Sequence, residues 1–220
     1  MERKACDFTH LLGRLTGISD VTLNAHFGLY EGYVKALNKI ETELRTADKT
    51  SPNYSFDEFS ELKRRLAVPF NGMALHEMYF DNLGARSDAG PEGDFEKLAT
   101  KSFGSLAAWL EDAKATGVGT NGWVVTALDL STSRLCNVML QEHHVGWPFQ
   151  HVPLMVLDTW EHAFYKDFAA KRKDYIDCFF ENLNWTIVQS RLKDAQRLLG
   201  DRPSGTTIEH AQWRTPSSPA

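Results

Sequence analysis

One change of hydrophobic pattern along the chain constrains the fold more than any other feature. Over roughly the first third of the sequence, apolar side chains recur at the three- and four-residue spacing of a helix face. The polar segment TADKTSPNYSF interrupts this pattern. We therefore expect an antiparallel helical hairpin. Its first helix begins near Ser19, and its second begins after Ser55 or Asp57 and is kinked or broken at Pro69.

The pattern changes after GARSDAGPEGDF, a hinge-like segment rich in Gly, Pro and Asp. Helical patterns lie at residues 95–115 and again at residues 159–199, the latter as one or two helices. The predicted fold class is α+β, with an N-terminal helical hairpin domain (1–88), a C-terminal α/β domain (89–200) and a loose polar tail (201–220). Between the two helical patterns, three apolar and β-branched runs indicate a small antiparallel sheet, namely GWVVTALDL, RLCNVMLQ and VPLMVLD.

Charge and cysteine content argue against several classes of function. A net charge of -5, with basic residues scattered along the chain, is not typical of proteins that bind nucleic acid or anionic membranes. No stretch approaches the ~18–20 apolar residues of a membrane span, and the charged start MERKACDFTHLLG does not resemble a signal peptide. We therefore expect a cytoplasmic protein. Cys6, Cys136 and Cys178 form no CxxC pattern, so we expect all three to be reduced thiols.

Charged residues interrupt the otherwise apolar run VLDTWEHAFY. Asp158 and His162 are four residues apart, so they would share one face of a helix that begins at or just before Asp158. A carboxylate beside an imidazole suits an iron, manganese or zinc ion. A helix-capping aspartate followed by a core histidine would have the same sequence, so this pair alone does not distinguish a metal site from a capped helix.

Two further histidines lie in apolar helical sequence. His26 adjoins the apolar face of the first helix, and His76 is surrounded by apolar residues in FNGMALHEMYFDNL on the second. Each alone is more often a hydrogen-bonded core residue. Together with Asp158 and His162 they favour a four-ligand site with room for a solvent or substrate molecule, because burying four such groups by coincidence is costly.

In their order along the chain, from about Ile18 to Arg191, these residues resemble the iron/manganese superoxide dismutase family. The most specific match is DTWEHAFY (residues 158–165), which is similar to the family block D-x-W-E-H-A-Y-Y. FNGMALH (residues 70–76) resembles the stretch that leads to the family's second histidine ligand. Weaker matches, also in family order, are SFGSLAAW, GW at residues 122–123, PLMVLD and NLNW.

The resemblance implies that His26, His76, Asp158 and His162 bind one manganese or iron ion per subunit. It also implies the family fold, a helical hairpin followed by an α/β domain with a three-stranded antiparallel sheet. The implied activity converts superoxide, a small anion, to dioxygen and hydrogen peroxide. Zinc is excluded from this role because it has no redox chemistry.

Residues around the ligands carry further implied roles. Arg172, three residues before Tyr175, is similar in position to the family's arginine that guides superoxide, although a solvated residue of the run KRKD would look the same. Trp123 and Trp160 would line the pocket and keep it dry, or serve as plain core aromatics.

The choice of metal depends on a glutamine. Iron-type members carry it four residues before the second histidine ligand, where this chain has Gly72. Manganese-type members usually have glycine there and take the glutamine from the sheet, and Gln141 lies at a suitable distance before Asp158. The resemblance therefore favours manganese slightly over iron, although His143 or His144 could occupy the space of Gln141.

The first helix departs from the family. The usual pattern, H-x-x-x-H-x-x-x-Y, begins with a ligand histidine and ends with a gateway tyrosine at the entrance to the metal. Here HFGLYEGY (residues 26–33) is one residue shorter and lacks the middle histidine. Seven residues turn a helix ~100° less than eight. We therefore expect either Tyr30 or Tyr33 to be the gateway residue, and Tyr33 to need a local change of helix winding.

The same departure affects the expected dimer. The missing histidine normally contacts a tyrosine of the partner subunit near the position of Tyr165, so the resemblance does not extend to that contact. Glu161 is retained, and the resemblance implies that it bonds the partner's His162 across a two-fold axis. We therefore expect a homodimer.

Three functions fit this sequence. They are an active superoxide dismutase, a dismutase-like metalloprotein with altered redox activity, and a metal-free structural module of the same fold. Retention of all four ligand residues counts against the third.

Overall fold

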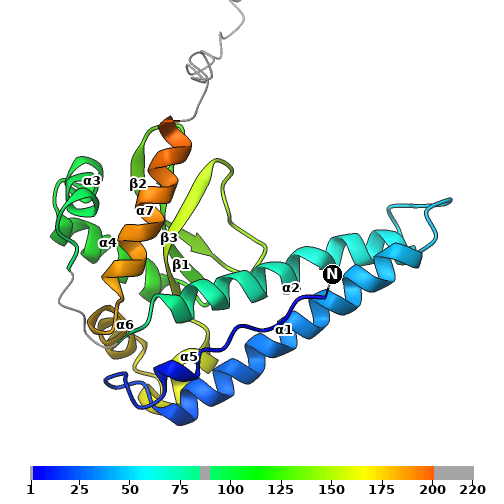
Figure 1. The fold of residues 1–220 in the computed structure, drawn as a ribbon, viewed down its shortest axis with the longest axis horizontal. Coiled ribbons are helices and arrows are strands. Elements are labelled where there is room, and N and C mark those ends of the chain that lie inside the picture. Colours follow the sequence, from blue (N-terminus) through cyan, green and yellow to red (C-terminus); the bar gives the residue numbers. More distant parts are fainter. Residues whose placement is uncertain (1, 85–89, 201–220) are drawn as a thin grey trace, which may run out of the picture.

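The first part of the chain forms a long helical hairpin. The computed structural model describes residues 2–84 and 90–200. A short 3-10 helix, η1 (Thr9–Leu11), precedes α1 (Asp20–Thr46) and α2 (Glu58–Asp81). Figure 1 shows α1 and α2 side by side, projecting from the part of the protein that contains the sheet. The predicted hairpin is therefore confirmed.

Local chemistry explains where these helices begin. The Ser19 hydroxyl caps α1 by accepting a hydrogen bond from the Thr22 amide at 3.2 Å, and the Asp57 carboxylate caps α2 in the same way. The predicted break at Pro69 is absent, because α2 is one helix from Glu58 to Asp81 with Pro69 inside it. Proline removes one backbone hydrogen bond, and the extensive packing of α2 against α1 compensates for that loss.

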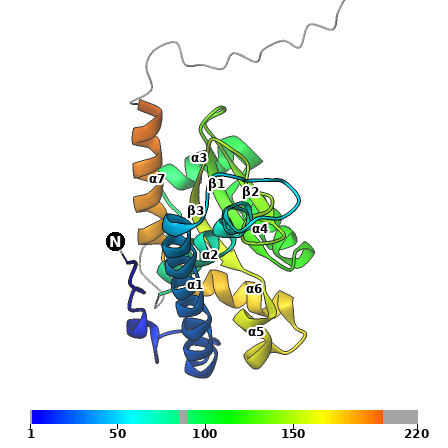
Figure 2. The ribbon, with the colours of Figure 1, turned by 90° about the vertical axis from the view of Figure 1, so that its right-hand side faces the viewer.

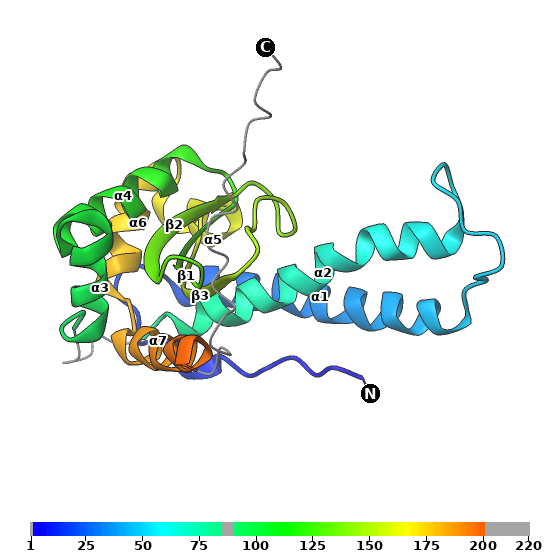
Figure 3. The same cartoon turned by 90° about the horizontal axis from the view of Figure 1, so that it is seen from above.

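The second part of the chain encloses the sheet between helices. In chain order its elements are α3 (Asp94–Phe103), α4 (Leu106–Gly119), β1 (Trp123–Asp129), β2 (Arg134–Leu140), β3 (His151–Asp158), α5 (Glu161–Phe168), α6 (Arg172–Glu181) and α7 (Trp185–Gly200). α4 and α7 lie on opposite sides of the sheet (Figures 2 and 3). The predicted α+β class is confirmed.

More helices form than the sequence indicated. The pattern at residues 95–115 comprises two helices, because Gly104 has a φ of 92°, a left-handed conformation that ends α3. The pattern at residues 159–199 comprises three helices rather than one or two. Ala169, with a φ of 49°, ends α5, and α6 ends before Asn182.

The sheet places the end of β3 beside the start of β1. Its three strands are antiparallel in the order β2-β1-β3, as predicted. Trp123 pairs with Leu140 of β2 and with Asp158 of β3. β1, the central strand, is buried along almost its whole length, so the end of the sheet where Trp123 and Asp158 pair lies inside the protein. Asp158 therefore enters the interior as the last residue of a strand.

Parts of the domain prediction are not tested. The boundary at residue 88 and the tail 201–220 lie outside the described residues, so the division into domains stays a prediction. Leu83 and Leu183 form an isolated β-bridge that joins the end of the hairpin to the segment before α7. None of the helices within residues 2–84 and 90–200 is long and apolar enough to cross a membrane.

Candidate metal centre

Four side chains from separate elements converge between the hairpin and the sheet. They are His26 on α1, His76 on α2, Asp158 at the end of β3 and His162 in the first turn of α5. One ligand atom of each lies within 4.8 Å of the others, and the first three residues are buried. The Asp158 Oδ2 atom lies 3.1 Å from His26 Nε2, 3.0 Å from His162 Nε2 and 3.9 Å from His76 Nε2.

The structure corrects the reason why Asp158 and His162 meet. We expected both on one helix, but Asp158 is the last residue of β3 and α5 begins only at Glu161. The chain turns between them, and the Trp160 amide donates to Asp158 Oδ1 at 2.8 Å. This bond leaves Oδ2 facing the three histidines. Pairing with β1, rather than helix periodicity, therefore orients the carboxylate.

The hydrogen positions of His76 test whether a metal fits. His76 Nδ1 lies 2.5 Å from the Gly72 carbonyl, which can only accept, so the ring hydrogen is on Nδ1. Burial lowers the pKa of His76 to about 3, so the ring is neutral. Its Nε2 lone pair is buried without a hydrogen-bond partner among the described residues and faces Asp158 Oδ2. Two lone pairs in this arrangement repel each other unless a cation lies between them.

The distances from Asp158 to the three histidines agree with this interpretation. Bonds of about 2.0–2.2 Å to one ion, at angles of 90–120°, separate ligand atoms by roughly 2.8–3.8 Å. Asp158 Oδ2 lies 3.0 to 3.9 Å from the three Nε2 atoms. Imidazole and carboxylate donors suit iron and manganese. The residues present therefore fit such an ion.

Electrostatics keep the carboxylate ionised and two of the histidines neutral. Burial alone would raise the pKa of Asp158, but the charge of His162 and hydrogen bonds with His162 and His26 hold that pKa well below its usual range. Burial lowers the pKa of His26. Burial also opposes the charging of His162, but the Asp158 carboxylate outweighs it and raises the pKa of His162.

A second group of residues lies beside the four. Trp123 Nε1 donates to His143 Nδ1 at 2.9 Å, and His143 Nε2 lies 2.6 Å from the Tyr33 hydroxyl oxygen. The rings of Tyr33 and Trp123 lie 5.3 and 4.9 Å from the His76 ring. Tyr33 therefore reaches the site from α1, which is α-helical throughout, so the expected change of winding is absent.

The other gateway candidate, Tyr30, points elsewhere. Its hydroxyl donates to Glu77 Oε1 at 2.7 Å and accepts from the Cys6 amide at 2.8 Å. Tyr30 is buried beneath the N-terminal segment. Both hydrogen bonds turn its hydroxyl away from Asp158.

Two more predicted site residues lie apart from the four donors. Gln141 is exposed directly after β2, and the buried position beside Tyr33 belongs to His143. Arg172 donates to the Thr120 carbonyl at 2.7 Å and to Asn121 Oδ1 at 2.6 Å, so it binds the connection between α4 and β1.

Sequence analysis missed two buried tyrosines next to the site. Tyr175 donates to the main-chain carbonyl of Asp158 at 2.7 Å, and Tyr79 lies 3.1 Å from the Tyr175 hydroxyl. Two signals were available. Tyr79 lies three residues after His76 and so on the same side of α2, and Tyr175 lies three residues after Arg172 in the match to the family.

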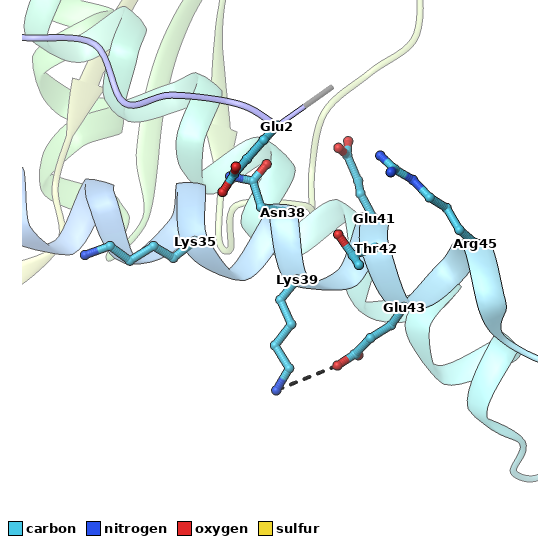
Figure 4. Close-up of a pocket in the computed structure, with 8 residues that line it drawn as sticks. All are labelled: Glu2, Lys35, Asn38, Lys39, Glu41, Thr42, Glu43 and Arg45. Carbon is cyan, nitrogen blue, oxygen red and sulfur yellow. Dashed lines mark ion pairs between the residues drawn. The ribbon is translucent and has the colours of Figure 1, made fainter.

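A hollow elsewhere on the surface has no comparable set of histidine and carboxylate donors. Figure 4 shows it along the outer side of α1, where basic and acidic side chains alternate and Lys39 pairs with Glu43 at 3.8 Å. Exposed, self-compensating charges of this kind are typical of a solvated helix face. Its lining residues are Glu2, Lys35, Asn38, Lys39, Glu41, Thr42, Glu43 and Arg45.

Comparison with known proteins places this chain in a family. Residues 91–191 match the family model for iron/manganese superoxide dismutases, C-terminal domain. The chain is 35% identical over 187 residues to "Superoxide dismutase [Fe]" of Aquifex aeolicus, which covers 83% of this chain and 88% of that protein. The chain belongs to the iron/manganese superoxide dismutase family. This confirms the resemblance found in the sequence.

Relatives in this family are named for either metal. "Superoxide dismutase [Fe]" of Cupriavidus metallidurans is 33% identical over 84% of this chain and 93% of its own length. "Superoxide dismutase [Mn] 2" of Haloferax volcanii is 28% identical over 82% of this chain and 90% of its own length. Membership in the iron/manganese superoxide dismutase family therefore does not select one of the two metals.

Proposed function

We propose that the protein is a superoxide dismutase with a mononuclear manganese or iron site formed by His26, His76, Asp158 and His162. Two superoxide anions and two protons would yield one dioxygen and one hydrogen peroxide. The observation that carries the proposal is the buried lone pair of His76 Nε2, which faces Asp158 Oδ2 at 3.9 Å in a chain of this family. The bound ion would supply one-electron redox chemistry, which zinc lacks.

Tyr33 and His143 are the residues proposed to hold protons at the site. An indole only donates, so the hydrogen bond from Trp123 requires an unprotonated Nδ1 on His143. Burial lowers the pKa of His143, which favours the neutral ring with its hydrogen on Nε2. His143 then donates to the Tyr33 oxygen, and the Tyr33 hydroxyl hydrogen is free for substrate or solvent. We propose Tyr33 as the gateway residue in preference to Tyr30.

The metal is proposed as manganese or iron without preference. The preference for manganese depended on Gly72 and Gln141, but Gln141 is exposed. The glycine at position 72 is explained by packing instead of metal choice, because a β-carbon there would approach the Tyr33 ring to 2.7 Å. We propose that His143 takes the role expected for Gln141.

A homodimer remains part of the proposal. Glu161 and Tyr165 are exposed on α5, and His162 is partly exposed between them. Glu161 of one subunit would bond the partner's His162, which would couple each metal site to the interface. Arg172, the first residue of α6, packs over the ring of Phe164 on α5 at 5.6 Å, so a role in guiding superoxide near this surface stays a prediction.

The proposed location is the cytoplasm. Cys6, Cys136 and Cys178 are all free thiols, and proteins of reducing compartments commonly keep unpaired cysteines.

Metal reconstitution tests the function. Metal-free protein is loaded with manganese or with iron, the bound metal is quantified, and superoxide consumption is measured for each form. We expect one ion per subunit and activity with at least one metal. Fully loaded but inactive protein would favour altered redox chemistry, and protein without metal would favour a structural module. His26→Ala should abolish tight metal binding, and unchanged metal content would contradict the four-ligand site.

A further inference from the structure

Two buried tyrosines connect the main chain of Asp158 to the helix that carries His76. Tyr175 on α6 and Tyr79 on α2 are both fully buried. Tyr175 donates to the Asp158 carbonyl at 2.7 Å, and the two hydroxyl oxygens lie 3.1 Å apart. We propose that Tyr79 and Tyr175 are positioning residues that hold Asp158 at the distance from His76 that metal binding requires. This proposal rests on the metal site proposed above.

The hydrogen bonds have one possible direction. A carbonyl only accepts, so the single hydroxyl hydrogen of Tyr175 is committed to Asp158. The hydrogen between the two tyrosines must then come from Tyr79. Burial raises the pKa of both hydroxyls, so neither ionises near neutral pH. The chain therefore runs from Tyr79 to Tyr175 to the Asp158 carbonyl.

This chain spans the junction between the hairpin and the sheet. Tyr79 follows His76 by three residues on α2, and its ring lies 5.1 Å from that of His26. Tyr175 packs against the Phe164 ring of α5 at 5.2 Å. The two tyrosines thus contact or adjoin elements that carry all four proposed ligands.

Asp158 lies where β3 ends, and the next residue still holds the main chain, because the Thr159 amide donates to the Gly122 carbonyl at 2.9 Å. Asp158 forms the last pair in the β1–β3 register, and the Trp160 amide fixes only the side-chain oxygen Oδ1. The bond from Tyr175 holds the Asp158 carbonyl itself, in addition to the bond that Thr159 makes to Gly122. Hydrogen-bond partners of ligand residues commonly change metal affinity by 10–100-fold when they are removed.

The two tyrosines should not contribute equally. Tyr175→Phe leaves the Asp158 carbonyl and the Tyr79 hydroxyl without their partners, both in a buried site. Tyr79→Phe removes the outer hydrogen bond but keeps the bond to Asp158. The matched control is Thr126→Val. It also removes a buried hydroxyl, but that hydroxyl bonds Trp109 and Asn137 and no proposed metal ligand.

The test measures manganese and iron affinity by chelator competition on folded protein. Thermal midpoints of the metal-free forms and visible spectra of the oxidised loaded forms are recorded in parallel. We expect Tyr175→Phe to weaken affinity about 10–100-fold and to shift the spectrum, and Tyr79→Phe to weaken it less than about 10-fold. Thr126→Val should lower the midpoint while affinity and spectrum stay as in the wild type.

Three results would overturn the proposal. One is that Tyr175→Phe lowers the midpoint like Thr126→Val but keeps wild-type affinity and spectrum, which would mean that the hydroxyls serve stability alone. The second applies if Tyr175→Phe does not fold. Tyr79→Phe then tests the proposal, and wild-type affinity and spectrum in that variant would overturn the proposed role of the Tyr79–Tyr175–Asp158 hydrogen bonds. Absence of tight metal binding in the wild-type protein would overturn both this proposal and the proposed function.

Discussion

The ring of Tyr33 lies directly against the α-carbon of Gly72. A β-carbon at Gly72 would approach three ring atoms of Tyr33 to between 2.7 and 3.0 Å, closer than real side chains approach one another. Gly72 also accepts the hydrogen bond from His76 Nδ1 through its carbonyl. One glycine therefore supports both a proposed ligand and the proposed gateway tyrosine.

Gly72→Ala should displace Tyr33 and lower activity. Because the new methyl group cannot fit, the ring must move and the 2.6 Å contact between Tyr33 and His143 should break. Misplacement of about 1 Å at such a site costs up to about 100-fold, so we expect a loss of 10- to 100-fold in kcat/KM at normal metal content. Gly32→Ala is the control, since nothing lies within 4 Å of its new β-carbon. Equal activity in both variants would contradict this role of Gly72.

Tyr33→Phe and Tyr30→Phe should affect different properties. Loss of the Tyr33 hydroxyl should lower kcat by about 10-fold, with little change in metal content, because His143 loses its partner. Loss of the Tyr30 hydroxyl should lower the free energy of unfolding by about 1–2 kcal/mol, because Glu77 and the Cys6 amide each lose a hydrogen-bond partner. Steady-state kinetics and urea unfolding check both. The reverse pattern would make Tyr30 the gateway residue.

Substitutions of His143 separate its hydrogen bonds from its volume. His143→Gln retains a donor and an acceptor for Tyr33 and Trp123, whereas His143→Leu retains neither. We expect the leucine variant to lose at least about 10-fold in activity and the glutamine variant to stay near the wild-type value. Similar losses in both variants would mean that the imidazole itself is required.

Metal removal should destabilise the fold. Binding to the folded state alone, at a free metal concentration 1,000 times Kd, contributes about 4.1 kcal/mol. For a chain of this size that corresponds to roughly 8–16 °C in the unfolding midpoint. Calorimetry with and without chelator measures the difference, and His76→Ala should abolish it. An unchanged midpoint in the wild-type protein would exclude a tightly bound metal.

Asp129 should contribute stability that acid removes. Burial alone would raise its pKa, but hydrogen bonds from Ser131 and Thr132 lower the pKa to about 2, below the value of 3.8 for an unperturbed aspartate. Because the folded-state pKa is the lower one, this stabilisation is full above about pH 5 and disappears as the pH falls towards 2. The unfolding free energies of Asp129→Asn and wild-type protein should therefore converge between pH 5 and pH 2. A constant difference would contradict this linkage.

Several elements could be predicted because their causes are local. Capping by Ser19 and Asp57, and alternation of apolar residues in the strands, depend on residues near one another in the chain. The break between α3 and α4 is also local, but it depends on the conformation of Gly104, which glycine allows without requiring.

The sequence by itself determined the helical hairpin, the three strands, the family and the four candidate ligands, because each depends on residue type and spacing. Only the tertiary structure decided that Asp158 ends a strand, that Tyr33 rather than Tyr30 faces the site, and that His143 rather than Gln141 is buried there. These outcomes depend on contacts between residues more than thirty positions apart. Such contacts set the direction of a side chain, which helix or strand periodicity alone leaves open.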